Sequence, residues 1–197
     1  MTGPIIRPAW LRVTHWINAA SVLLMVLSGW QIYDAAPIFP GVRFPASLTL
    51  GGWLGGALLW HFAVMWILVI NYLAYLGLAL GSGRLRRDLL PVRFAAFVSD
   101  FAAALRGRLK HEDLAHYNAV QKAAYLFAIA DIALLVLSGL ALWKSVQFPF
   151  LREAMGGYDA ARIVHFAAMS AIVVFFAVHV VMVALVPRSL LLMVRGR

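Results

Sequence analysis

The chain of 197 residues is 63% hydrophobic and 13% charged, with a mean hydropathy of +0.86. These values are typical of an integral membrane protein and leave no room for a sizeable water-soluble domain. The sequence has no cysteine, which excludes disulfides, thiolate-held iron–sulfur clusters and c-type haem attachment. Any redox centre must therefore be held by histidine or methionine, or without covalent linkage.

Four apolar runs are each long enough to cross a hydrocarbon core of about 30 Å. The first is too long for a signal peptide and has no small-residue cleavage site after it, so we expect it to remain as a helix. The sequence predicts an all-α fold, an integral membrane four-helix bundle that forms a single domain over residues 1–197. The expected spans are approximately residues 10–33, 50–80, 117–146 and 161–186.

The basic residues behind the net charge of +9 lie mostly on one side of the membrane. Most basic residues precede the first span, lie between the second and third, or follow the fourth, which with four spans is one side of the membrane. The other side has only Arg43, Lys144, Arg152 and Arg162. The positive-inside rule then places both termini in the cytoplasm, in a multi-pass protein of the bacterial inner membrane. The basic charge indicates contact with anionic lipid rather than with nucleic acid.

Span one carries Arg12 and His15 on one face near its inner end. Arg12 is a candidate partner for a carboxylate such as a haem propionate, and the alternative is a topology charge at the lipid headgroups. Gly29 follows His15 by 14 residues and lies on nearly the same face at the outer level. Because it has no Cβ, it would allow a flat ring to approach the backbone.

Span two runs from outside to inside, so its His61 lies in the outer half. The connection after it reads as an amphipathic helix on the cytoplasmic membrane surface, with apolar residues at helical spacing. These residues are Phe94, Phe97, Val98, Phe101 and Leu105. The polar stretch that follows contains His111 and His116, which we expect at the membrane edge rather than as haem ligands.

Span three has a polar cluster at its inner mouth, made of Asn118, Gln121 and Lys122. Asp131 lies near mid-membrane, where it would relay protons, bond to the second nitrogen of a ligand histidine, or act as a protonated interhelical hydrogen bonder. The segment VLSGL echoes the VLSGW of span one, so Gly139 is a candidate for a second close approach like that at Gly29.

Span four carries His165 and His179, which are 14 residues apart. In a helix this spacing is about 21 Å of rise and places both imidazoles roughly 40° apart on one face. Depth pairs His15 with His179 at the inner level and His61 with His165 at the outer level. Each pair would hold one haem iron from both faces, which suits electron transfer rather than oxygen chemistry.

Two other interpretations of these histidines stand beside the haem one. The four side chains would instead satisfy interhelical hydrogen bonds, or they would bind zinc or copper. Zinc and copper sites usually gather their ligands at one depth and often include carboxylates or thiolates. Four histidines at two matched depths favour haem.

The histidine pattern resembles that of the prokaryotic cytochrome b561 and hydrogenase-type cytochrome b superfamily. The likeness lies in the THW of span one, the single histidine of span two and the histidine spacing of span four, and it extends over essentially the whole chain. The segments HYNAVQKAAY and VLSGLALW are similar to the branch of thiosulfate reductase cytochrome b subunits.

The resemblance implies two haem b groups that exchange electrons with a membrane quinone, ubiquinone or menaquinone. It also implies a periplasmic catalytic partner, such as a molybdopterin oxidoreductase. The quinone site would lie at Asn118, Gln121 and Lys122, unless these residues cap the third helix or bind haem propionates. The direction of electron flow and any homo-oligomer stay open.

Two other functions are compatible with the sequence. One is a stand-alone superoxide:quinone oxidoreductase, which would attract its anionic substrate with the four basic residues of the outer side. The other is a non-redox transporter or scaffold, which would carry no haem.

Overall fold

A computed structural model describes residues 6–106 and 117–196, so His111 and His116 lie outside the described residues. The described chain is helical throughout and contains no strand. The all-α prediction is confirmed, since four helices are long and apolar enough to cross a membrane. They are α1 (Ala9–Ala35), α2 (Leu54–Gly81), α4 (Ala119–Trp143) and α6 (Tyr158–Leu185). The shorter elements are η1 (Ala46–Leu48), η2 (Leu85–Leu89), α3 (Phe94–Leu105), α5 (Pro149–Ala154) and α7 (Pro187–Arg195).

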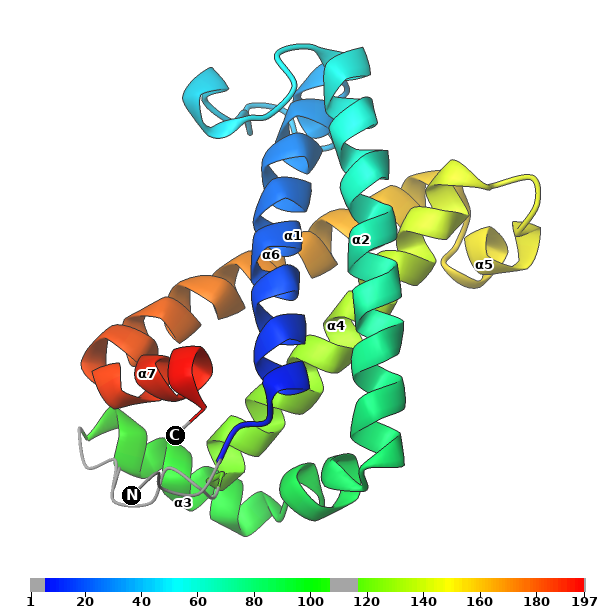
Figure 1. The fold of residues 1–197 in the computed structure, drawn as a ribbon. Coiled ribbons are helices and arrows are strands. Elements are labelled where there is room, and N and C mark those ends of the chain that lie inside the picture. Colours follow the sequence, from blue (N-terminus) through cyan, green and yellow to red (C-terminus); the bar gives the residue numbers. More distant parts are fainter. Residues whose placement is uncertain (1–5, 107–116, 197) are drawn as a thin grey trace.

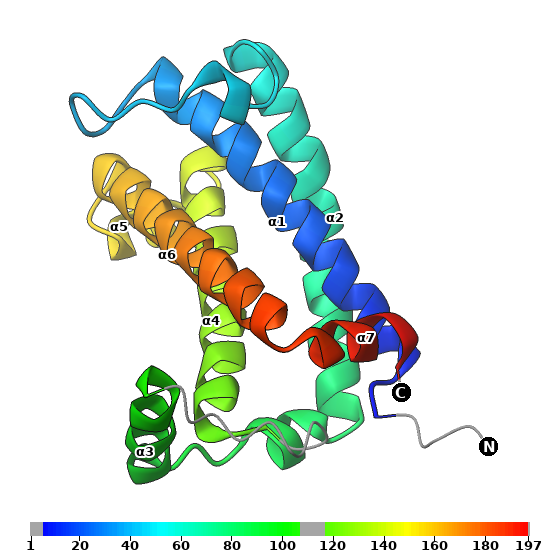
Figure 2. The same ribbon diagram turned by 90° about the vertical axis from the view of Figure 1, so that its left-hand side faces the viewer.

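The four long helices form two pairs. The most extensive packing is of α1 along α2 and of α4 along α6 (Figures 1 and 2). The start of α1, the surface helix α3 and the last helix α7 lie at one end of the bundle, here called the terminal end. The opposite end carries η1 and α5 and is here called the loop end. Side chains that reach across join the two pairs, as where the Tyr72 hydroxyl donates to the Ile129 carbonyl at 2.9 Å.

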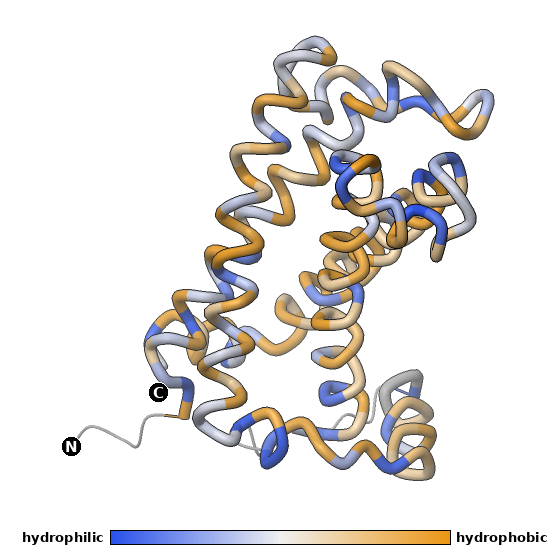
Figure 3. The backbone as a smooth tube through the Cα atoms, turned by 90° about the vertical axis from the view of Figure 1, so that its right-hand side faces the viewer, coloured by the Kyte–Doolittle hydropathy of each residue, from blue (hydrophilic) through white to orange (hydrophobic). Residues whose placement is uncertain are grey.

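Large apolar side chains point outward along the spans. Leu59 on α2 and Val174 on α6 are 74% and 64% exposed, and apolar residues predominate along the long helices in Figure 3. The residues with no exposed surface are small, and they include Ala57, Ala141 and Ala161. Small residues at the contacts and large ones outside are the arrangement expected of helices in lipid. The chain is therefore a multi-pass membrane protein.

Helix α2 begins at Leu54, a turn later than the start near residue 50 that hydropathy predicts. Gly51 and Gly52 have φ values of +112° and +71°, in the left-handed region that favours glycine. A Cβ on Gly51 would lie 2.3 Å from the backbone nitrogen of Ala57. The two glycines thus form a tight turn packed on the first turn of α2, and they lie outside the helix.

The amphipathic surface helix predicted after span two is present as α3. Its apolar residues Phe94, Val98 and Phe101 are exposed, and the Phe97 and Phe101 rings stack with their centres 5.9 Å apart. The Asp100 carboxylate accepts a hydrogen bond from the backbone N–H of Ala119 at 2.9 Å, which ties α3 to the start of α4. An apolar face turned outward at the bundle end suits a helix that lies on a lipid surface.

Helix α7 is a feature that the sequence analysis did not predict. It begins with Pro187 and ends at Gly196, whose φ of +83° terminates the helix. The carbonyls of Met193 and Val194 accept hydrogen bonds from the Trp16 indole at 3.1 Å and from Arg12 Nη1 at 2.6 Å. Helix α7 therefore closes the terminal end of the bundle against α1.

Candidate functional site

Two histidine pairs face each other across the bundle, at the two levels expected from the sequence. The rings of His15 (α1) and His179 (α6) have centres 6.0 Å apart, each about two turns from the terminal end of its helix. The rings of His61 (α2) and His165 (α6) have centres 6.5 Å apart, each about two turns from the loop end. These are called below the terminal-end pair and the loop-end pair.

The spacing of both pairs fits one metal ion held between two imidazoles. Metal–nitrogen bonds of about 2.0 Å on opposite sides of an ion place the two ring centres roughly 6 Å apart. In the part of the chain that the structure describes, no group of three or more histidine and acidic side chains is placed to hold a metal. Two ligands per site, with the other positions left to the cofactor, match haem ligation and do not match a protein-built zinc or copper site.

Both histidines of the loop-end pair are hydrogen-bonded at Nδ1 by a buried serine. Ser28 Oγ lies 3.0 Å from His61 Nδ1, and Ser138 Oγ lies 2.8 Å from His165 Nδ1. Sequence analysis missed both serines, although each directly precedes a glycine that it had singled out. The signal was present in the repeated VLSG segment.

Gly29 and Gly139 lie against the same two imidazoles. A Cβ on Gly29 would be 3.5 Å from Cε1 of His61, and a Cβ on Gly139 would be 3.4 Å from Cε1 of His165. The close approach predicted at both glycines thus involves a flat ring, but the ring is that of the histidine. Contact of these glycines with haem stays a prediction.

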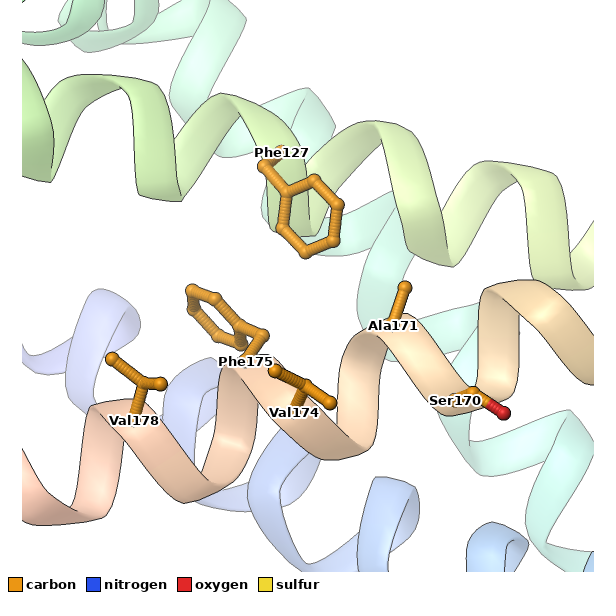
Figure 4. A pocket seen from close by; sticks show the side chains of 6 residues that line it. All are labelled: Phe127, Ser170, Ala171, Val174, Phe175 and Val178. Carbon is orange, nitrogen blue, oxygen red and sulfur yellow. The ribbon is translucent and has the colours of Figure 1, made fainter.

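An apolar pocket of about 510 Å³ lies beside the terminal-end pair, between α4 and α6 (Figure 4). Phe127 and Phe175 face each other across it, with ring centres 5.8 Å apart. The Phe175 ring also stacks nearly parallel to the His179 ring at 5.9 Å. The pocket therefore offers a hydrophobic ligand a position one aromatic ring away from the histidine.

The chain is similar to known proteins over nearly its whole length. Residues 6–196 match the family described as prokaryotic cytochrome b561. The chain belongs to this family. A protein provisionally named protein-methionine-sulfoxide reductase subunit YedZ1, from Azospira oryzae, is 61% identical over 97% of this chain and 96% of its own length. A protein provisionally named Ni/Fe-hydrogenase B-type cytochrome subunit, from Azotobacter vinelandii, is 25% identical over 91% of this chain and 79% of its own length.

The family prediction made from the histidine pattern is confirmed, and with it electron transport across the membrane as the general function. Membership implies haem b as the cofactor. Among the described residues, four histidines face one another in two pairs, and their ligation of haem iron stays a prediction.

Arg12 of this cytochrome lies near the start of α1, as the sequence predicts, and its contact there is with the backbone of α7. Its Nη1 donates to the Val194 carbonyl, at the end of α7. Its Nε is buried and has no hydrogen-bond partner among the described residues. Arg12 therefore holds α7 in place and keeps one unused donor, and its contact with a haem propionate stays a prediction.

The polar cluster at the start of α4 forms a helix cap, as one of the two alternatives predicted. Asn118 Oδ1 accepts from the backbone N–H of Gln121 at 2.8 Å, and Gln121 Oε1 accepts from the backbone N–H of Asn118 at 3.1 Å. Lys122 follows, half-buried, one residue into the same turn. The capping contacts use the amide oxygens, so the NH₂ groups are the side-chain donors left for a ligand.

Asp131 is 6% exposed on α4, and its Oδ2 has no hydrogen-bond partner among the described residues. It does not bond to the second nitrogen of either loop-end histidine, because serines lie at those positions. Its other predicted roles, as a protonated interhelical hydrogen bonder or a proton relay, stay predictions.

A small pocket of about 30 Å³, with polar groups in a partly apolar lining, lies at the terminal end and has roughly the room one water needs. Three tyrosines contribute to its lining, Tyr75, Tyr117 and Tyr125, together with the ion pair of Arg84 and Asp88 at 3.0 Å. Burial raises the pKa of the Tyr117 hydroxyl, just outside the span, so this phenol stays protonated. The pocket combines hydroxyl donors with a carboxylate acceptor.

Proposed function

We propose that this b561-family protein carries electrons across the membrane between a quinone and a catalytic partner, using two bis-histidine haem b groups. The observation that carries the proposal is that two histidine pairs face each other with ring centres 6.0 and 6.5 Å apart. Each pair contains one histidine of α6. The spacing of His165 and His179 along α6 is about 21 Å, most of the thickness of the hydrocarbon core. Two centres at these levels would connect the two membrane faces.

Each helix has a separate task in this arrangement. Helix α6 supplies one ligand to each site, α1 supplies His15 and α2 supplies His61. Haem b held by these histidines would supply a one-electron redox centre at each level. The apolar surroundings keep water from the sites and set the electrostatic environment of the iron.

The charge distribution supports an orientation with the terminal end in the cytoplasm. Basic residues gather at this end on α1, η2, α4 and α7. The loop end has few, as the positive-inside rule requires for a periplasmic face. We therefore propose a protein of the bacterial inner membrane in which the terminal-end pair is the cytoplasmic one.

The quinone would react at the terminal end, near His15 and His179. Asn118, Gln121 and Lys122 offer N–H donors to quinone carbonyls, and the amide NH₂ groups are not used by the helix cap. The pocket of Tyr75, Tyr117 and Tyr125 beside Asp88 offers hydroxyls and a carboxylate to protons exchanged with quinol. The apolar pocket at Phe175 suits the hydrophobic part of the molecule.

The catalytic partner would dock on the loop end. Trp53, Val146 and Phe150 are 69%, 84% and 65% exposed there, beyond the ends of the spans. The relatives are named as subunits of a methionine-sulfoxide reductase and of hydrogenases. We propose a periplasmic oxidoreductase partner of the molybdopterin type, and the 61% relative favours one that reduces sulfoxides.

The contacts of the basic residues at the loop end argue against the stand-alone superoxide function. Arg152 is ion-paired with Glu153 at 2.7 Å, and Arg162 donates to the Ala36 carbonyl. Lys144 lies over the Trp143 ring at 4.3 Å. The Glu153 carboxylate offsets the charge of Arg152, and Asp159, 3.9 Å from Arg162, offsets part of the charge there, so less net positive charge is left to attract an anion.

A pyridine haemochrome assay per polypeptide tests the haem proposal. We expect two haems b in the wild type, loss of the loop-end haem in His165→Ala and loss of the terminal-end haem in His179→Ala. His116→Ala, in the polar segment before span three, is the control and should keep both. Non-selective loss in both histidine variants would show that the pairing is wrong.

Two replacements of Asn118 separate capping from quinone binding. Asn118→Asp keeps a strong N-cap acceptor but removes the NH₂ donor, whereas Asn118→Ala removes both. We expect the aspartate variant to retain wild-type thermal stability and to be reduced more slowly by quinol in stopped-flow spectra. Equal quinol rates in the aspartate variant and the wild type would exclude a donor role for Asn118.

A further inference from the structure

The loop-end and terminal-end pairs differ in the hydrogen bonding of their imidazoles. We infer that Ser28 and Ser138 are positioning residues that fix both loop-end ligands in the Nδ1–H tautomer, direct Nε2 at the iron, and lower the reduction potential of that haem. The inference rests on the proposed haem ligation and adds to it a difference between the two centres.

The contact between each serine and its histidine is short and excluded from solvent. The Oγ to Nδ1 distances are 3.0 Å for Ser28 with His61 and 2.8 Å for Ser138 with His165. Both serines are 0% exposed, the largest fully buried side chains among the described residues. No water competes for the second imidazole nitrogen at these positions.

The hydrogen positions follow from the other partner of each serine. Ser28 Oγ donates its proton to the Leu24 carbonyl at 2.8 Å, and Ser138 Oγ donates to the Leu134 carbonyl at 2.7 Å. A hydroxyl has one proton, so toward the histidine each Oγ acts as an acceptor. The Nδ1 atoms must therefore carry hydrogen.

Backbone carbonyls lead to the same assignment. Ser28 Oγ also lies 3.2 Å from the Met25 carbonyl oxygen, and Ser138 Oγ lies 3.3 Å from the Leu135 carbonyl oxygen. A carbonyl oxygen accepts and never donates. With Nδ1 protonated, Nε2 has the free lone pair that a metal requires.

The same four-residue sequence, which occurs twice in the chain, creates both contacts. Val26–Gly29 and Val136–Gly139 both read VLSG, and each lies on a helix packed beside the one that carries the histidine. In each, the serine meets Nδ1 and the following glycine leaves room for Cε1. Because the same arrangement occurs twice, in two separate helix pairs, we attribute it to selection rather than to chance packing.

The terminal-end pair has no such bonds. Within residues 6–106 and 117–196, the rings of His15 and His179 have aromatic neighbours, Trp16 and Phe175, and no hydrogen-bonded partner. A hydrogen bond from Nδ1–H raises the basicity of the imidazole as a ligand. A more basic ligand stabilises the oxidised iron, so the serines lower the potential of the loop-end haem.

The test replaces the serines in a background that holds the loop-end haem alone, His179→Ala. Alanine at Ser28, at Ser138 and at both leaves the histidines His61 and His165 in place, so we expect the haem to be retained. Ser170→Ala is the matched control, because Ser170 Oγ donates to the Phe166 carbonyl at 2.9 Å on the same helix as His165 and contacts no histidine.

Redox titration and low-spin electron paramagnetic resonance are the readouts. We expect a higher midpoint potential and shifted g values in each serine variant, the largest change in the double variant, and wild-type values in Ser170→Ala. Ser138→Cys, with a weaker acceptor, should be intermediate between Ser138 and alanine. An unchanged potential and spectrum in a double variant that binds haem would overturn the inference while leaving the haem proposal intact. Equal haem content in His165→Ala and the wild type would instead overturn the haem proposal.

Discussion

A size series at Gly139 tests the contact between α4 and the loop-end histidine. A Cβ at this position would lie 3.4 Å from Cε1 of His165, the short limit of an ordinary van der Waals contact. Gly139→Ala should therefore leave the ring in place and add up to about 1 kcal/mol of helix stability. Valine places two further carbons about 1.5 Å beyond Cβ, and its stiff χ1 limits their escape, so the imidazole must move by roughly 1 Å. Metal–ligand distances tolerate only about 0.2 Å, so Gly139→Val should lose the loop-end haem.

Haem per polypeptide, measured by the haemochrome assay, reads out the series. We expect two haems with alanine and one with valine, the one that remains having the spectrum of the His165→Ala protein. Gly77→Val is the control, because a Cβ on Gly77 of α2 meets nothing within 4 Å among the described residues. Loss of haem in Gly139→Ala would refute the reasoning, since it would mean that the cofactor itself fills the space beside this glycine. Retention of two haems in Gly139→Val would refute it as well.

Three further replacements test the helix contacts. Asn71 is 7% exposed and donates to the Thr14 carbonyl at 2.9 Å, so Asn71→Leu should lower the free energy of unfolding in detergent by about 1–3 kcal/mol, measured by thermal denaturation. Arg12→Ala removes the donor to the Val194 carbonyl, and limited proteolysis should then cut α7 faster while the loop-end haem spectrum stays unchanged. Asp131→Leu removes a buried carboxyl oxygen without a partner, so it should raise the unfolding free energy by about 1–3 kcal/mol and retain two haems. A lower stability in this last variant would show that Asp131 makes a favourable contact in the protein.

The spans and the pairing of the histidines could be predicted because both depend only on the depth of each residue in the membrane. Hydropathy fixes where a helix must cross lipid, and alternation of direction then fixes the depth of each histidine. His61 and His165 meet because both are about two turns from the same end of their helices. No knowledge of helix packing was needed for that result.

Features that depend on local backbone geometry were harder to predict. Gly51 and Gly52 have apolar neighbours, so hydropathy counts them within the span, although their left-handed φ values exclude them from the helix. Pro187 marks the end of α6 in the sequence, but proline is equally suited to the first turn of the next helix, and α7 begins there. Both features were missed because composition carries no information about the backbone angle φ.

The serine contacts illustrate a different limit of sequence reasoning. A serine in a membrane helix commonly bonds to the carbonyl four residues earlier, and Ser28 and Ser138 both do so. Which serine also faces a histidine depends on the rotation of two helices about their axes. The capping box of Asn118 and Gln121, by contrast, lies within one turn, and the sequence allowed it as an alternative.

The contacts between α1 and α7 impose an order on biosynthesis. Trp16 and Met193 are 177 residues apart in the chain, and Arg12 and Val194 are 182 apart. The first helix thus leaves the ribosome long before its hydrogen-bond acceptors exist. The helix pair α1–α2 can insert and pack early, but the terminal end closes over α1 only after α7 has been synthesised. A chain without α7 would have every span and both histidine pairs, yet its terminal end would stay open.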